Sequence, residues 1–196
     1  MPQIQVRHRS IPMPNPLCGT EPSHTWAARL PSLPLSELLH AGYLSYYAVI
    51  FVPALLLFVK GRRYEFAATV LALTVTCTVC WAIFVALPVE GPRYLFSAPP
   101  GIPNGPIRRL AVSLLAAGSS RGAAFPSSHM AVSVAMAVTA LRWQRPVGWA
   151  VSVIALLVGV GAVYGGFHYG VDILAGAALG VATSTAIILV FDSKPS

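Results

Sequence analysis

Long apolar runs separated by short polar segments make up most of the chain. The runs cover residues 39–59, 66–87, 129–141, 147–163 and 173–191. A helix needs about 20 apolar residues to cross the ~30 Å hydrocarbon core of a bilayer. The pattern therefore predicts an all-α fold, a polytopic membrane helical bundle with about five spans. The third span is short unless its helix extends into the polar residues beside it.

The same pattern divides the chain into three segments. Residues 1–38 are polar and rich in proline, and they contain no apolar core of the kind that a secretory signal needs. Residues 39–192 hold the predicted spans and form one membrane domain. Within that domain, residues 107–117 are predicted to form a helix that is interfacial or partly buried. Residues 193–196 are a short tail.

Composition supports the bilayer as the solvent of this chain. Hydrophobic residues make up 56% and charged residues 10%, against roughly 25% charged in an ordinary soluble domain. The net charge of +7 raises the question of nucleic acid, which is bound by a basic face or stripe. Here the basic residues are scattered through short loops, so membrane topology explains them and no nucleic-acid partner is expected.

Basic residues also predict the orientation. They follow the first, third and fifth spans at Lys60, Arg62, Arg63, Arg142, Arg145 and Lys194. In an alternating topology these positions share one side, which the positive-inside rule makes cytoplasmic. The loop 88–128 and the turn 164–168 then lie at the outer face of a plasma or inner membrane. Five spans put Arg7, Arg9 and Arg29 at that face too, which counts against a complete five-span design.

His168 and Asp172 form the most informative pair of polar residues. They are four residues apart, so on a helix they lie on one face and can interact. An aspartate at the start of an apolar span needs a partner or a wet cavity. A carboxylate that accepts from one ring nitrogen fixes the tautomer and makes the other nitrogen a better base or nucleophile. Alternatively, Asp172 binds backbone N–H groups at a helix end and His168 lies at the membrane interface.

A second polar group opens the third span, where Pro126 is followed by Ser127, Ser128 and His129. Two hydroxyls and the unpaired backbone N–H groups of a helix start can together bind a phosphate. The alternative is that one of the serines only caps the helix. The histidine that follows favours a site, because the predicted topology puts it at the same membrane face as His168.

Arg93, in the sequence Gly91-Pro92-Arg93-Tyr94, follows the second span. Its guanidinium offers a fixed fork of donors that matches phosphate oxygens. An arginine at a membrane edge also serves as an anchor whose charged end reaches the interface. Its predicted position beside both histidines favours the phosphate-binding interpretation.

Together these three segments resemble the type 2 phosphatidic acid phosphatase (PAP2) superfamily, which includes lipid phosphotransferases and vanadium haloperoxidases. FPSSHMA is similar to the family's PSGH block, with Ser128 where glycine is usual, and HYGVDILAG is similar to its HxxxD block. GPRY resembles the arginine-bearing first block in the form found in the branch related to inositol phosphotransferases. The resemblance implies a six-helix bundle, of which about five spans are visible here, with the three blocks meeting in one pocket.

The resemblance also implies a mechanism and a substrate class. His168 would attack phosphorus and become a phosphohistidine, Asp172 would orient it, and His129 would protonate the leaving alcohol. Phosphoryl oxygens would be held by Arg93, Ser127, Ser128 and Arg121. The implied substrate is a lipid phosphate or a polyprenyl diphosphate, and neither a metal nor a cofactor is expected.

Two positions depart from the family pattern. Ala86 stands where the first block usually has a lysine, and Ala162 stands where the third block usually has an arginine. We therefore hypothesise that Arg121 replaces one of the missing charges, and that Arg121→Ala damages activity as much as Arg93→Ala. Two alternatives stay open: a lipid phosphotransferase that uses the same residues, and a catalytically weak or inactive membrane protein that keeps the fold.

Overall fold

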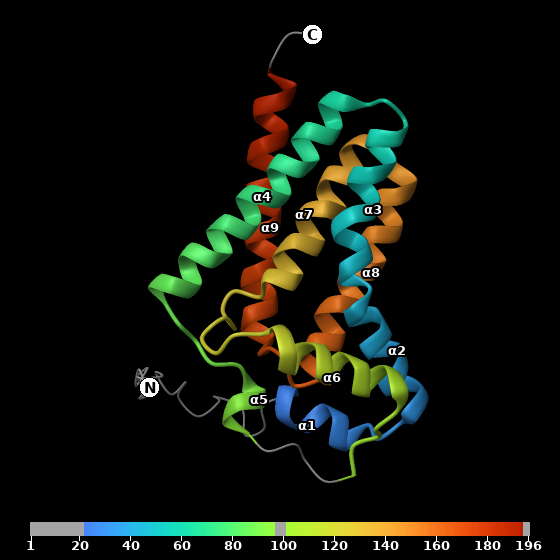
Figure 1. Cartoon of the computed structure of the whole chain (residues 1–196), viewed down its shortest axis with the longest axis vertical. Helices are drawn as coiled ribbons and strands as arrows, with labels where there is room; N and C mark the ends of the chain where they lie inside the picture. Colours follow the sequence, from blue (N-terminus) through green and yellow to red (C-terminus); the bar gives the residue numbers. More distant parts are fainter. Residues whose placement is uncertain (1–21, 97–100, 194–196) are drawn as a thin grey trace, which may run out of the picture.

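The structure, a computed structural model, describes residues 22–96 and 101–193, apart from the side chain of His24. Within these residues the fold is all-α, as predicted, and an isolated parallel bridge joins Val89 to Ala123. The helices are α1 Pro22–Arg29, α2 Leu33–Leu44, α3 Tyr46–Val59, α4 Arg63–Ala86, α5 Pro92–Leu95, α6 Pro106–Gly118, α7 Ser128–Trp143, α8 Arg145–Tyr164 and α9 Gly170–Asp192 (Figure 1). Most of the predicted N-terminal segment and tail, residues 1–21 and 194–196, lies outside the described residues.

Among the described residues three helices, α4, α8 and α9, are long and apolar enough to cross a membrane. The bent pair α2 and α3, whose axes differ by 43°, makes a fourth if the pair is one span. The predicted run at 129–141 becomes α7, which at 16 residues is shorter than a full span. The prediction of about five spans thus compares with three or four by length and composition. When the bent pair is counted as one span, α7 makes up the difference.

The first helical pair begins earlier than the predicted span at residue 39. Ser32 caps α2, because its side chain accepts a hydrogen bond from the backbone N–H of Leu35 at 3.5 Å. The pair bends at Ser45, whose hydroxyl donates to the carbonyl of Gly42 at 2.5 Å. The capping signal lies in the polar segment and not in the apolar run, so hydrophobicity alone places the start too late.

The short helix α7 lies at the centre of the bundle. It packs against α3, α4, α8 and α9 (Figure 1). Val132 and Met136 are fully buried and belong to the largest apolar cluster. A helix that is surrounded by protein does not have to match the thickness of the bilayer with its own apolar length. This position explains how α7 serves the fold with fewer residues than a span.

Glycines on α9 allow it to approach α7 closely. A Cβ added at Gly180 would lie 2.2 Å from the carbonyl oxygen of Ala131, and one at Gly176 would lie 2.4 Å from that of Ser127. Small residues permit this kind of backbone contact between helices in membranes. The contact aligns the first turns of α7 and α9, where the backbone N–H of Ser127 donates to the carbonyl of Asp172 at 3.0 Å.

The two ends of the bundle have different structures. At one end the turns after α3 and α7 are held by Arg62, which donates to the carbonyl of Trp143 at 2.6 Å. There Arg142 also pairs with Asp192 at 3.1 Å. At the other end, α5 and α6 lie near the starts of α7 and α9, and α6 packs against α2 (Figure 1). The helix predicted at 107–117 is α6, and it lies at the end that carries both candidate histidines.

Gly180→Ala tests the α7–α9 contact. The added methyl group meets the Ala131 carbonyl, so the helices must separate, and overpacking of this kind lowers the free energy of unfolding by about 1–3 kcal/mol. Thermal unfolding in detergent measures the loss. Gly170→Ala is the matched control, because a Cβ there meets nothing within 4 Å. Equal stability of the two variants would contradict the prediction.

Candidate functional site

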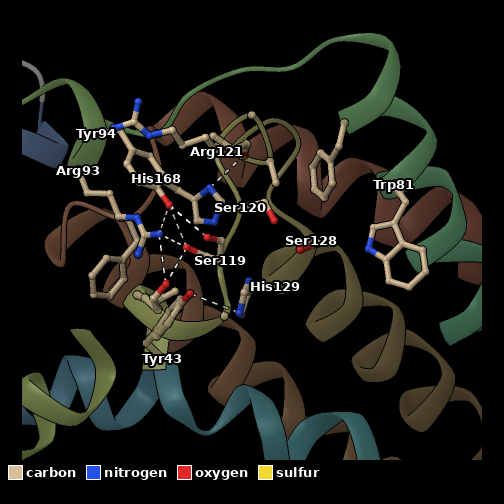
Figure 2. Close-up of a pocket in the computed structure, with 18 of the residues that line it drawn as sticks. Tyr43, Trp81, Arg93, Tyr94, Ser119, Ser120, Arg121, Ser128, His129 and His168 are labelled. Carbon is tan, nitrogen blue, oxygen red and sulfur yellow. Dashed lines mark hydrogen bonds between the residues drawn. The ribbon is translucent and has the colours of Figure 1, made fainter. Parts of the chain in front are cut away.

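A pocket of about 450 Å³ opens at the end of the bundle where α7 and α9 begin. Figure 2 shows side chains from distant parts of the chain that converge on it. Five of the seven residues predicted as site residues line the pocket: Arg93, Arg121, Ser128, His129 and His168. Ser127 and Asp172 lie behind its wall, and both are fully buried.

His168 is held from behind by acceptor atoms. Its Nδ1 lies 3.0 Å from the carbonyl oxygen of Ala124 and 3.5 Å from Oδ2 of Asp172. A carbonyl oxygen only accepts hydrogen bonds, so this contact places the proton of the neutral ring on Nδ1. The other ring nitrogen, Nε2, then carries the free lone pair. This is the tautomer that a nucleophilic histidine needs.

The turn before His168 fixes the position of the ring. The backbone N–H groups of Phe167 and His168 both donate to the carbonyl of Ala162, at 2.9 and 3.3 Å. Gly166 has a φ of +71°, a conformation that favours glycine. Ala162 is fully buried beneath this turn, at the position where the family pattern has an arginine. Because it packs in an apolar cluster with Tyr43, a long basic side chain would displace that cluster.

Asp172 has a double role in the geometry. Its Oδ2 accepts a hydrogen bond from the backbone N–H of Tyr169 at 2.8 Å, which caps α9. Oδ1 is buried and has no hydrogen-bond partner among the described residues. The helix-capping interpretation of Asp172 therefore describes its shortest contact, and the same carboxylate also lies 3.5 Å from Nδ1 of His168.

His129 faces His168 across the pocket from the first turn of α7. The two ring centroids are 6.3 Å apart and the ring planes are inclined by 56°. The Nε2 of His129 lies 3.3 Å from the hydroxyl of Tyr43 on α2, and the two rings stack with centroids 5.1 Å apart. The structure thus brings the two histidines together, although they are far apart in the sequence.

The two serines before His129 lie in different environments. Ser127 is the N-cap of α7, where its side chain accepts from the backbone N–H of Met130 at 3.4 Å. Ser128 lines the pocket beside His129 (Figure 2). The capping alternative thus describes Ser127, and Ser128 is the serine that a ligand in the pocket would meet.

Arg93 lies in α5 and enters the pocket from the side of α6. Its Nη2 donates to the hydroxyls of Tyr94 and Ser119 and, at 3.4 Å, to the carbonyl of Leu115. The guanidinium carbon also lies 4.5 Å from the centre of the Tyr94 ring. These contacts hold the guanidinium inside the pocket, so it is not free to extend towards the membrane surface as a mobile anchor.

Backbone contacts join the Arg93 segment to the His168 segment. Val89 accepts from the backbone N–H of Ala124 at 3.0 Å, and Ala124 in turn holds His168. A Cβ added at Gly91 would lie 2.9 Å from the carbonyl oxygen of Phe167, so only glycine permits this approach. The three sequence blocks therefore meet through the backbone as well as through side chains.

Arg121 lies at the rim of the pocket. Its side chain is 70% exposed, and its Nη1 is 3.7 Å from Oε1 of Glu90. The guanidinium carbon is 5.2 Å from the centre of the Tyr94 ring, on which Arg93 also stacks. Arg121 is thus near the site, but solvent and Glu90 compete for its charge.

Sequence reasoning did not single out two parts of the pocket. Tyr43 comes from α2, a helix without any motif, and it contacts His129. Trp81, Phe84 and Val85 come from the last turns of α4 and form an apolar wall. In Figure 2 Trp81 lies on the opposite side of the pocket from Arg93. A large aromatic residue inside an apolar run carries no local sign that it borders a polar site.

In the part of the chain that the structure describes, no group of three His, Cys, Asp or Glu side chains is placed to hold a metal ion. The chemical groups of the pocket are two imidazoles, two guanidinium groups and several hydroxyls. Such a set suits an anion with several oxygen atoms, and a nitrogen nucleophile lies beside it.

A protein-family model described as the PAP2 superfamily matches residues 20–186. The matched region contains all three sequence blocks and every helix that lines the pocket. It does not distinguish the branch related to inositol phosphotransferases from other branches. No curated protein and no solved structure matches the chain significantly.

Proposed function

The chain belongs to the PAP2 superfamily, and on this premise we propose that it is a membrane phosphatase acting through a phosphohistidine intermediate. The substrate is a lipid phosphate or a polyprenyl diphosphate. One observation carries the proposal: a single pocket joins two facing histidines and an arginine to an apolar wall on a helix fit to cross a membrane. A phosphorylated lipid has the same division into an anionic and a hydrocarbon part.

In the first step, Nε2 of His168 attacks phosphorus and the bond from phosphorus to the lipid oxygen breaks. Protonated His129 gives its proton to that oxygen, so a lipid phosphate releases an alcohol, and a polyprenyl diphosphate attacked at its terminal phosphorus releases the polyprenyl monophosphate. In the second step, His129 takes a proton from water, and the hydroxide oxygen displaces His168 from phosphorus. Inorganic phosphate leaves and both histidines return to their starting states.

The ring separation supports this division of roles. The ring centroids of His129 and His168 are 6.3 Å apart, so both rings border the same space. A phosphoryl group bound there would meet Nε2 of His168 on one side and have its leaving oxygen towards His129, as attack and proton donation require.

Arg93 and the start of α7 are suited to hold the other phosphoryl oxygens. The hydrogen bonds of Arg93 run through Nη2, which leaves the donors on Nε and Nη1 for a ligand. Ser128 adds a hydroxyl, and the first turn of α7 adds backbone N–H groups with the positive end of a helix dipole. Such an arrangement neutralises charge that develops in phosphoryl transfer.

The apolar wall supports a lipid substrate. Trp81 and Val85 are 66% and 85% exposed on α4, a helix long and apolar enough to cross a membrane. On such a helix an exposed apolar side chain faces hydrocarbon. The pocket therefore adjoins the acyl region, from which a lipid can enter sideways with its headgroup towards Arg93.

We also place the site at the outer face of the membrane. Support comes from the basic turns at the opposite end of the bundle, which hold Lys60, Arg62, Arg63, Arg142 and Arg145. Among the described residues the site end has as many: Arg29, Arg93, Arg108, Arg109 and Arg121. The placement thus rests on the rule for short loops.

Sealed right-side-out vesicles should hydrolyse an impermeant phosphate ester, and inverted vesicles should not. The reverse result would exclude the outer face.

The decisive experiment measures phosphate release by the protein purified in detergent. Phosphatidic acid and a polyprenyl diphosphate are the two substrates. We expect the wild type to release phosphate from at least one of them and His168→Ala to fall to the background rate, because the nucleophile is gone. Activity that is equal in both proteins, or absent from both, would exclude the phosphatase. Transfer of phosphate to an added alcohol in preference to water would favour the phosphotransferase alternative.

Arg93→Ala should lower kcat/KM about tenfold to a hundredfold, because a charge-assisted hydrogen bond contributes roughly 1.5–3 kcal/mol. Arg121→Ala should have a smaller effect, since Arg121 is 70% exposed and shares its charge with Glu90. The sequence alone led us to expect equal losses of activity in the two variants, and the exposure of Arg121 now leads us to expect the smaller loss in Arg121→Ala. Steady-state assays of both variants decide the order, and an Arg121→Ala loss as large as that of Arg93→Ala would restore the original hypothesis.

Trp81→Ala should raise KM for a long-chain lipid phosphate and leave a short-chain, water-soluble phosphate ester unaffected. The reason is that only the long chain reaches the wall on α4. Trp149→Ala is the matched control: Trp149 is 67% exposed, as Trp81 is at 66%, but it lies on α8 away from the pocket. Equal effects of the two variants on the long-chain substrate would contradict a chain-binding role of the wall.

A further inference from the structure

We propose that Tyr43 is a positioning residue for His129, and that its hydroxyl keeps the Nε2 of that histidine in place for proton transfer to the leaving oxygen. This inference rests on the proposed function. It gives a role to a residue outside the three sequence blocks. It concerns only the step in which His129 donates a proton to the leaving oxygen.

The contact joins the atoms that matter. The hydroxyl of Tyr43 lies 3.3 Å from Nε2 of His129, and both residues line the pocket. The rings are nearly parallel, inclined by 24° with centroids 5.1 Å apart. In Figure 2 the Tyr43 hydroxyl and the His129 ring meet at the same side of the pocket. The imidazole is therefore restrained both in its plane and at its reactive nitrogen.

The backbone around Tyr43 is fixed by close packing. A Cβ added at Gly42 would lie 2.8 Å from the Cβ of Leu157 on α8. One added at Gly161 would lie 2.3 Å from the carbonyl oxygen of Leu39. Tyr43 itself is 2% exposed. Because its backbone is fixed, the Tyr43 hydroxyl can determine the position of the His129 ring. A mobile tyrosine would instead adjust to the position of the histidine.

Tyr43 also contacts the nucleophile's segment. Its ring lies 4.9 Å from the ring of Phe167, the residue before His168. The same side chain thus packs between the candidate acid and the turn that carries the candidate nucleophile. A change in the Tyr43 position would alter the distance between the two histidines as well as the orientation of His129.

A phenol suits both protonation states of the histidine. When His129 is protonated, Nε2 carries a single hydrogen, which the Tyr43 oxygen and the leaving oxygen share in a three-centre hydrogen bond until it passes to the leaving oxygen. Once Nε2 is neutral, the Tyr43 hydroxyl can donate to its lone pair. Phenylalanine would keep the ring stacking and the volume but lose the hydrogen bond, so the hydroxyl is the separable part of the contact.

The test compares two substrates with Tyr43→Phe. A long-chain alkyl phosphate needs a proton on its leaving oxygen, and a long-chain nitrophenyl phosphate leaves as a stable anion. We expect kcat/KM to fall about tenfold to a hundredfold for the alkyl ester, part of the contribution of a general acid, and less than about threefold for the nitrophenyl ester. Because kcat/KM reports on steps up to the departure of the leaving group, the second hydrolytic step does not obscure the comparison.

Tyr46→Phe is the control, since the Tyr46 ring also packs on His129, at a centroid distance of 4.2 Å. Among the described residues, the Tyr43 hydroxyl is the group within hydrogen-bond distance of the His129 Nε2. We expect Tyr46→Phe to keep both activities within about twofold. An equal loss on both substrates in Tyr43→Phe would mean a structural role, and no loss on either would mean no role. Either result would overturn the role proposed for Tyr43. The phosphatase proposal would still stand if the wild type is active and His168→Ala is not.

A second measurement does not need activity. The imidazole nitrogen resonances of His129, identified with His129→Gln, report on the hydrogen bond at Nε2. Tyr43→Phe should shift the Nε2 resonance and Tyr46→Phe should leave it unchanged. An unshifted resonance in Tyr43→Phe would overturn the proposal even if the wild type releases no phosphate and the phosphatase itself fails.

Discussion

The close approach of α7 and α9 determines where every other part of the site can lie. Gly176 and Gly180 bring the two backbones together, and the hydrogen bond from Ser127 to the carbonyl of Asp172 aligns the helix starts. His129 then projects from one helix start and His168 precedes the other. Because main-chain atoms make the contact, no side chain of the pocket takes part in it.

The buried carboxyl group of Asp172 lies next to this contact. A polar group removed from water costs free energy unless hydrogen bonds offset the loss. Here Oδ2 accepts from the backbone N–H of Tyr169 at 2.8 Å and lies 3.5 Å from the His168 ring, while Oδ1 has no hydrogen-bond partner among the described residues. The residue therefore contributes to helix formation and to the electrostatics of the site at once, and the two sequence interpretations of Asp172 are not exclusive.

Local patterns predicted what depends on local structure. The apolar runs predicted the long helices, because these depend on neighbours along the chain. The four-residue spacing predicted that His168 and Asp172 lie close together, but His168 lies in the turn before α9 and not on the helix that was expected. The early start of α2 depends on a cap at Ser32, which hydrophobicity does not detect. The contact of Tyr43 with His129 joins residues that no motif links, so it required the tertiary structure. Which serine lines the pocket depends on the residue at which α7 begins, and the sequence does not define that residue.

The apolar wall at Trp81 and Val85 has a consequence for how a substrate of the proposed class is encountered. A pocket with one side in hydrocarbon samples molecules that diffuse in two dimensions, so its occupancy depends on their mole fraction among the surrounding lipids. Dilution of the membrane with inert lipid or detergent would then slow turnover although the amount of substrate per volume stays constant. The substrate concentration that governs turnover is therefore the amount of substrate per area of membrane.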